Sequence, residues 1–162
     1  MRLLPAAFLL ASGAAAAPVP LLSFAGYGAV RFGMTLTEAQ RATGDTVQAQ
    51  HPAQDPEACY YVTFTGYAHA RFMVEEGHIT RAELDKSGRT ALGITAGMPL
   101  TEVRQRFPHV IIRPHKYDEA GHYLVFPSRS GNAEIVAEES AGQVTMVRGG
   151  LLPAVEYVEG CL

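Results

Sequence analysis

The most informative feature of the sequence is a short segment that occurs twice. Its first copy opens with Gly33-Met34-Thr35-Leu36-Thr37-Glu38, and the second opens, 64 residues later, with Gly97-Met98-Pro99-Leu100-Thr101-Glu102. Glycine, methionine, leucine, threonine and glutamate match in place. Self-similarity at a fixed spacing is typical of a duplicated structural unit. We therefore expect two tandem repeats, one at about residues 24–88 and the other at about residues 89–162.

Each copy predicts a short helix with a defined start and end. Thr35 and Glu38 have the spacing of a capping box, and Gly44 lies where the first helix would end. In the second copy, Pro99 suits the first helical turn and Pro108 stops the helix. Helices this short are marginal in water by themselves, so each should pack against a sheet.

The segments after each helix supply that sheet, because they are rich in β-branched and aromatic residues and are separated by turn residues. The predicted strands are residues 59–64, 70–75, 79–85, 110–117, 122–126, 133–138, 144–148 and 155–159, and residues 44–58 are predicted to be a long loop. Runs of strands after a helix, twice over, indicate an α+β fold rather than a parallel α/β sheet. We expect one domain made of two tandem helix-plus-antiparallel-sheet repeats.

The Gly-Met-Thr-x-x-Glu opening of the first helix, followed by a small antiparallel sheet, resembles a known repeat. This repeat occurs in the beta-lactamase-inhibitor protein and in the small outer-membrane-assembly lipoproteins of similar architecture. The resemblance implies a non-catalytic role in binding another protein. The chain departs from the pattern because it has no lipid-attachment cysteine and neither copy contains its own disulfide. Residues 114–124 and 155–161 are also similar to segments of a group of secreted bacterial proteins.

Residues 1–16 predict a secretory signal peptide, with one positive charge at Arg2, a short apolar run and then small residues. The apolar run is shorter than the roughly 20 residues that a spanning helix needs. We place cleavage after Ala16, and an uncleaved N-terminal anchor is the alternative. The mature domain, residues 17–162, is then expected in the periplasm or outside the cell, without a lipid anchor.

The charge of the chain bears on its partners. The formal net charge is −3, and loss of Arg2 with the leader makes it −4. This net negative charge argues against nucleic acid as a partner. No later hydrophobic stretch is long enough to cross a membrane. We therefore expect another exported protein as the partner.

The two cysteines of the chain, Cys59 and Cys161, are predicted to form a disulfide, because an even count in an exported chain implies one. The alternatives are two free thiols or a redox pair, although a redox pair usually has C-x-x-C spacing. The bridge would tie the leading strand of the first repeat to the last strand of the second. It would contribute about 4–5 kcal/mol in the chain-entropy model.

A histidine-rich stretch is the candidate binding site. If residues 111–117 and 122–126 form a hairpin around residues 118–121, strand alternation places Arg113, His115, Tyr117 and His122 on one face. Tyrosine supplies contact area at low entropic cost, which favours protein recognition by this face. The alternative is that these residues are ordinary half-buried strand positions.

The same hairpin allows another function. His115 and His122 would be diagonal neighbours, and with Asp118 they could bind Zn²⁺, so a small-ligand or metal-binding protein is the alternative. A secreted hydrolase is a third possibility, but the chain contains no G-x-S-x-G, phosphate-loop, H-E-x-x-H or C-x-x-C pattern. We therefore expect a recognition module, an inhibitor or envelope adaptor, that is not an enzyme and uses no cofactor.

Overall fold

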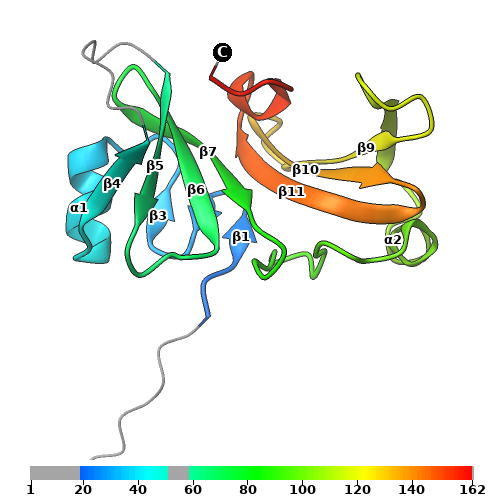
Figure 1. Ribbon diagram of the computed structural model, residues 1–162, viewed down its shortest axis with the longest axis horizontal. Helices are drawn as coiled ribbons and strands as arrows, with labels where there is room; N and C mark the ends of the chain where they lie inside the picture. The colour runs from blue at the N-terminus through cyan, green and yellow to red at the C-terminus, as the bar shows by residue number, and fades with distance from the viewer. Residues whose placement is uncertain (1–18, 51–58, 162) are drawn as a thin grey trace, which may run out of the picture.

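One large antiparallel sheet organises the chain. In the computed structural model, which describes residues 19–50 and 59–161, eight strands form this sheet in the order β4-β5-β6-β7-β11-β10-β9-β8. Figure 1 shows that the sheet turns between β7 and β11, so that β4–β7 stand steeply while β10 and β11 lie nearly horizontal. We call β4–β7 the first half of the sheet and β8–β11 the second half.

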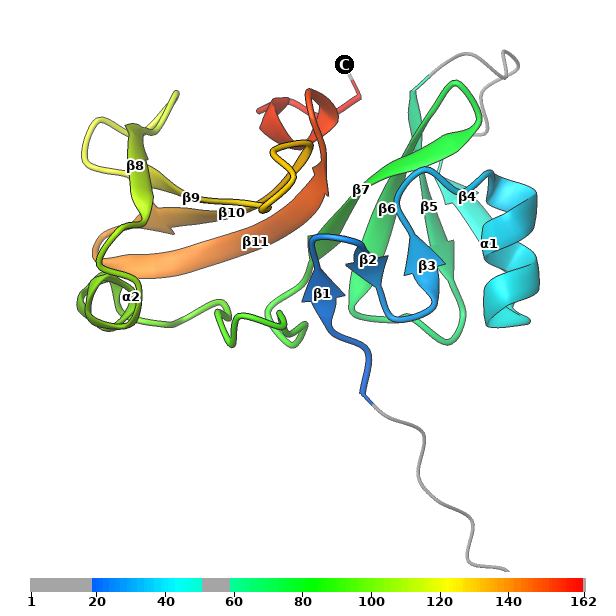
Figure 2. The same cartoon turned by 180° about the vertical axis from the view of Figure 1, so that it is seen from behind.

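A smaller antiparallel sheet of three strands, β1–β3, precedes the first helix and lies against the first half of the large sheet (Figure 2). The strands are β1 (Leu22–Ser23), β2 (Gly26–Tyr27), β3 (Val30–Arg31), β4 (Val47–Gln50), β5 (Tyr60–Phe64), β6 (Ala70–Glu75), β7 (His78–Leu84), β8 (Ile111–Pro114), β9 (His122–Pro127), β10 (Ala133–Ser140) and β11 (Gln143–Leu151). The helices are α1 (Leu36–Thr43), α2 (Leu100–Arg106) and a short 3₁₀ helix, η1 (Ala154–Glu156).

The two predicted helices are present, and the first has the predicted cap. The hydroxyl of Thr35 accepts the N–H of Glu38 at 3.2 Å, and the Glu38 carboxylate accepts the N–H of Thr35 at 2.9 Å. The helix α1 ends at Gly44, which is left-handed. The helix α2 starts after Pro99 without a side-chain cap and ends at Phe107.

Both helices begin against a hairpin turn of the large sheet. The turn between β6 and β7 is Glu76-Gly77, and the turn between β10 and β11 is Ala141-Gly142; all four residues have positive φ. Two-residue hairpins adopt this geometry because it matches the twist of the strands. The carbonyl of Gly77 accepts the N–H of Leu36 at 3.3 Å, and the carbonyl of Gly142 accepts the N–H of Leu100 at 2.9 Å.

The segment before each helix pairs with the strand that leaves the turn. Met34 and Ile79 are joined by a 2.8 Å hydrogen bond, and Met98 and Val144 by one of 2.9 Å. The hairpins also share a register shift. It falls between Met73 and Val74 in β6 and, 65 residues further along, between Glu138 and Glu139 in β10. The same joint between helix and hairpin is therefore made twice.

The two faces of the large sheet differ in what covers them. The face toward α1, α2 and β1–β3 carries the main core, which includes Leu22, Val62, Phe64, Phe72, Val103, Leu124, Phe126 and Ile135. The opposite face carries a smaller apolar cluster, formed by Tyr123, Val125, Val136 and Val155 with Val158 packed against it. Burying apolar surface on both faces fixes the sheet between the helices and the C-terminal segment.

The C-terminal segment, residues 152–161, is not a strand, so the prediction for residues 155–159 is wrong. The chain leaves β11 through Pro153 and forms η1, which lies across β7, β10 and β11. Figure 1 shows this segment above β11, in the opening between the two halves. The predicted disulfide is present, with 5.2 Å between the Cα atoms of Cys59 and Cys161. It joins the start of β5 to this segment rather than to a last strand.

Other strand predictions need correction at their edges. Residues 47–50 of the predicted loop form β4, and β8 stops at Pro114 instead of reaching Tyr117. The strands β1–β3 had no counterpart in the prediction. The proposed cleavage site and residues 51–58 lie outside the described residues. Within the described part, no helix is long and apolar enough to cross a membrane.

Candidate functional site

The hairpin of β8 and β9 carries the residues predicted to form a binding face, and its register separates them. Arg113 pairs with Tyr123, whereas the predicted register paired Tyr117 with His122. Neighbouring residues of a strand point to opposite faces, so His122 faces the main core while Tyr123 and Arg113 face the C-terminal segment. The prediction that His122 shares a face with Arg113, His115 and Tyr117 is therefore wrong.

His115 organises the loop that follows β8. Its ring stacks on the ring of Tyr123, with 4.6 Å between centroids and 26° between the planes. Its Nδ1 atom lies 3.2 Å from the N–H of Tyr117 and 3.1 Å from the N–H of Asp118, and it accepts both. The proton of the neutral ring therefore sits on Nε2, which lies 3.7 Å from the carboxylate of Glu138.

Asp118 is held within the same loop. The Ser140 hydroxyl donates to its carboxylate at 2.5 Å, and the N–H of Ala120 donates at 3.0 Å. These hydrogen bonds, that of Ser140 above all, hold the pKa of Asp118 below its usual value. Because His122 faces away, the predicted zinc ligands His115, His122 and Asp118 do not converge. Within residues 19–50 and 59–161, no group of three or more His, Cys, Asp or Glu residues is placed to hold a metal ion.

His122 supports the second hairpin joint. Its Nδ1 lies 2.7 Å from one carboxylate oxygen of Glu139, which is buried, and the other oxygen accepts the N–H of Gly142 at 2.6 Å. Gly142 is the turn residue that binds the start of α2. The histidine thus contributes to packing at this joint.

Five charged and aromatic residues from the hairpin and the C-terminal segment form what we call the Tyr117 surface: Arg113, Lys116, Tyr117, Glu156 and Glu159. Arg113 binds Glu156 at 2.5 Å, and Lys116 binds Glu159 at 2.7 Å. The Tyr117 hydroxyl also donates to Glu159. The Lys116 ammonium lies 5.1 Å from the centroid of the Tyr117 ring, yet that side chain remains 65% exposed.

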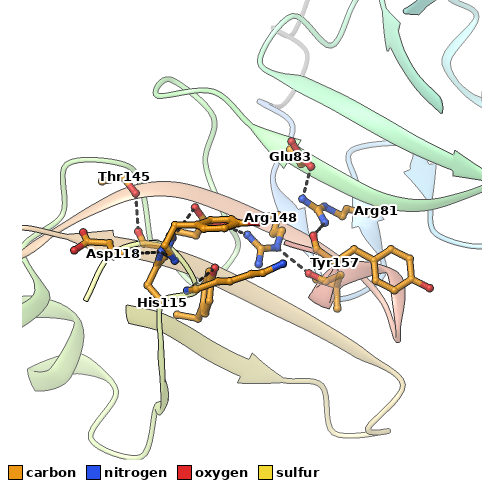
Figure 3. A network of polar contacts seen from close by, with 12 residues as sticks. Arg81, Glu83, His115, Asp118, Thr145, Arg148 and Tyr157 are labelled. Carbon is orange, nitrogen blue, oxygen red and sulfur yellow. Dashed lines mark hydrogen bonds and ion pairs between the residues drawn. The ribbon is translucent and has the colours of Figure 1, made fainter. Parts of the chain in front are cut away.

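Two arginines hold the C-terminal segment from below. Arg81 and Arg148 are each only 2% exposed. Arg81 donates to the carbonyl oxygens of Tyr157 at 2.5 Å and of Ala154 at 3.3 Å, and Arg148 donates to that of Val155 at 2.8 Å. Figure 3 shows Arg81 between Glu83 and the backbone of Tyr157.

Carboxylates of the sheet balance these two arginines. Glu83 pairs with Arg81, and Glu138 pairs with Arg148. Glu83 also accepts from Tyr61 at 2.8 Å and from Arg71 at 2.6 Å. Burial opposes ionisation of Glu83, but Arg81, Tyr61 and Arg71 outweigh it, so its pKa lies below the usual value. Burial, together with the charge of Glu83, raises the pKa of Tyr61 to about 12.

Sequence reasoning missed this arginine network and the partners of the tail carboxylates. The tail carboxylates are those of Glu156 and Glu159, which bind Arg113 and Lys116. These contacts join residues that are far apart in the chain, and no local sequence pattern predicts such contacts.

Comparison with models of protein families, with curated proteins and with solved structures found no match. In its described residues the chain is a mixed α/β protein, mostly sheet, with two α-helices and one disulfide.

Proposed function

We propose that this protein is an exported, non-catalytic recognition module that binds another exported protein, as an inhibitor or an envelope adaptor. The leader-like residues 1–16 and the Cys59–Cys161 disulfide support export, because disulfides persist in oxidising compartments. We also propose that the chain consists of two tandem repeats. The paired helix–hairpin joints, with matching turns and register shifts, support this.

The Tyr117 surface is the proposed contact with the partner, and the exposed but oriented ring of Tyr117 carries the proposal. Tyrosine and arginine are enriched where interfaces concentrate their binding energy. Tyr117 is tied at its hydroxyl by Glu159 and lies beside the Lys116 ammonium, so it loses little rotamer freedom on binding. His115 supports it from behind by accepting the N–H of Tyr117.

A binding experiment with matched variants tests this proposal. The mature, oxidised protein is immobilised in periplasmic and culture-fluid extract, and retained proteins are identified by mass spectrometry. Tyr117→Ala should abolish specific retention, because truncation of a central aromatic anchor costs about 2 kcal/mol or more. Tyr157→Ala, an exposed tyrosine outside the Tyr117 surface, serves as the control and should bind as the wild type does. Equal retention by the wild type and Tyr117→Ala, with both folded, contradicts the proposal.

A further inference from the structure

The C-terminal segment is bound to the sheet as a ligand would be bound. Its main chain is held by side chains of the sheet: Arg81 and Arg148 donate to three of its carbonyl oxygens. Both arginines are fixed from behind by the carboxylates of Glu83 and Glu138. The donors are therefore positioned by the sheet itself, and contacts to carbonyl oxygens accept any sequence.

Side chains of the segment are recognised with a spacing of three residues. Val155 is fully buried in the small apolar cluster, and Val158 packs against the same cluster. The residue after each valine is an acid, and each acid binds a base of the hairpin: Glu156 binds Arg113, and Glu159 binds Lys116. The side chain of Tyr157, between the two pairs, points away from the hairpin loop in Figure 3. The segment thus contacts the sheet with the pattern apolar–acidic–any–apolar–acidic.

The fit of the segment is incomplete. A cavity of about 40 Å³ remains between the segment and the sheet, lined by Val136, Arg148, Glu156 and Val158 among others. One water needs about 10–15 Å³ of such volume, so this space also accepts an additional methylene. A larger aliphatic side chain at the position of Val158 fills it better than valine does.

We propose that this face of the sheet, over β7–β11, is a binding site for an acidic peptide with the pattern apolar–acidic–any–apolar–acidic, and that residues 154–159 occupy it in the same chain. The disulfide keeps this internal occupant in place, because its Cys161 end is tied to Cys59. A peptide of another chain enters only when the segment is released. The site shares Arg113 and Lys116 with the Tyr117 surface, but its buried arginines and apolar cluster lie beneath the segment. Tyr117 itself takes no part in the peptide site, so the Tyr117→Ala binding experiment and the peptide experiment can fail separately.

The test uses the full chain with its own C-terminal segment released from the sheet. The open variant combines Cys59→Ser, Cys161→Ser and Val158→Asp, because an aspartate at position 158 cannot be buried in the apolar cluster. The probe is a fluorescein-labelled peptide with the sequence of residues 154–160, followed by fluorescence anisotropy. The open variant should bind it saturably, and oxidised wild type should not bind it.

Two altered peptides check the recognition pattern. Replacing both glutamates by glutamine should weaken binding about two- to fivefold for each ion pair lost, since these pairs are half exposed. Replacing the valine equivalent to Val158 by leucine should strengthen binding about fourfold, because one more methylene is buried. A folded open variant without saturable binding overturns the proposal, as does oxidised wild type that binds the peptide equally well.

A second measurement serves if the open variant does not fold. The single variant Cys161→Ser is mixed with a peptide of residues 154–161 in a glutathione buffer. The peptide thiol and the Cys59 thiol lose two electrons and two protons to oxidised glutathione, which yields a mixed disulfide and two reduced glutathione molecules. The peptide should form several-fold more adduct than its glutamine counterpart. Equal adduct from both peptides overturns the proposal.

Discussion

Arg148 of β11 and Glu83 of β7 lie directly opposite each other in the ladder that joins the two halves of the sheet. Each has its principal partner elsewhere: Arg148 pairs with Glu138, and Glu83 pairs with Arg81. The centre of the molecule thus contains alternating charges with little access to water. Because the C-terminal segment rests on both arginines, this charge network links the two halves to the segment.

Removing one carboxylate from this network should strongly destabilise the fold. We expect Glu83→Gln to lower the free energy of unfolding by about 3–5 kcal/mol, since Arg81 is left buried without its counter-charge. Glu119→Gln, on an exposed loop, should change it by less than about 0.5 kcal/mol. Urea unfolding at neutral pH measures both. A Glu83→Gln protein as stable as the control variant contradicts this account of the network.

Glu134 should make stability fall as the pH rises. It is 6% exposed, and burial, with the nearby charge of Glu156, raises its pKa above the usual value. A carboxyl group with a higher pKa in the folded than in the unfolded protein stabilises the fold while it is protonated, at pH values below the pKa of the unfolded protein. This contribution is lost as the pH rises through the pKa of the folded protein. Glu134→Gln should therefore raise the melting temperature at pH 7 and leave it nearly unchanged at pH 4. An equal change at both pH values refutes this assignment.

The two hairpin turns offer a test of their equivalence. Gly77 and Gly142 have φ of 74° and 82°, and a Cβ atom at either position meets no atom within 4 Å. Alanine at either position should therefore lower the free energy of unfolding only by the strain of the left-handed backbone, about 1–2 kcal/mol. Asparagine should lower it by less. Thermal unfolding of the four single variants measures this. A large cost at one turn and none at the other argues that the joints are not equivalent.

Export has a direct chemical readout. If residues 1–16 are a signal peptide cleaved after Ala16, the exported protein begins at Ala17. N-terminal sequencing of protein recovered from periplasm and medium gives the answer. Recovery of a chain that still begins at Met1, attached to the membrane, supports the uncleaved anchor instead.

The helices and most strands of the large sheet were predictable because their signals are local. Thr35 and Glu38 form a capping box within one turn of helix, and Gly77 marks its hairpin from two adjacent residues. The disulfide followed from the count of cysteines. None of these inferences required knowledge of which strands pair.

The site was less predictable because it depends on register and on distant contacts. A different register in the β8–β9 hairpin turned His122 to the other face, since side chains alternate along a strand. Val155, Tyr157 and Val158 suggest a strand by composition, yet their segment crosses the face of the sheet and forms no ladder with any described strand. It is fixed instead by Arg81 and Arg148, whose positions only the folded sheet determines.

Recognition of a partner by the Tyr117 surface can be tested in living cells by site-specific photo-crosslinking. A photoreactive phenylalanine analogue is placed at position 117 in one protein and at position 41, on the exposed side of α1, in another. Both are exported by living cells and irradiated. We expect one discrete adduct with an exported protein from position 117 and none from position 41. No adduct from position 117, or the same adduct from both positions, contradicts it.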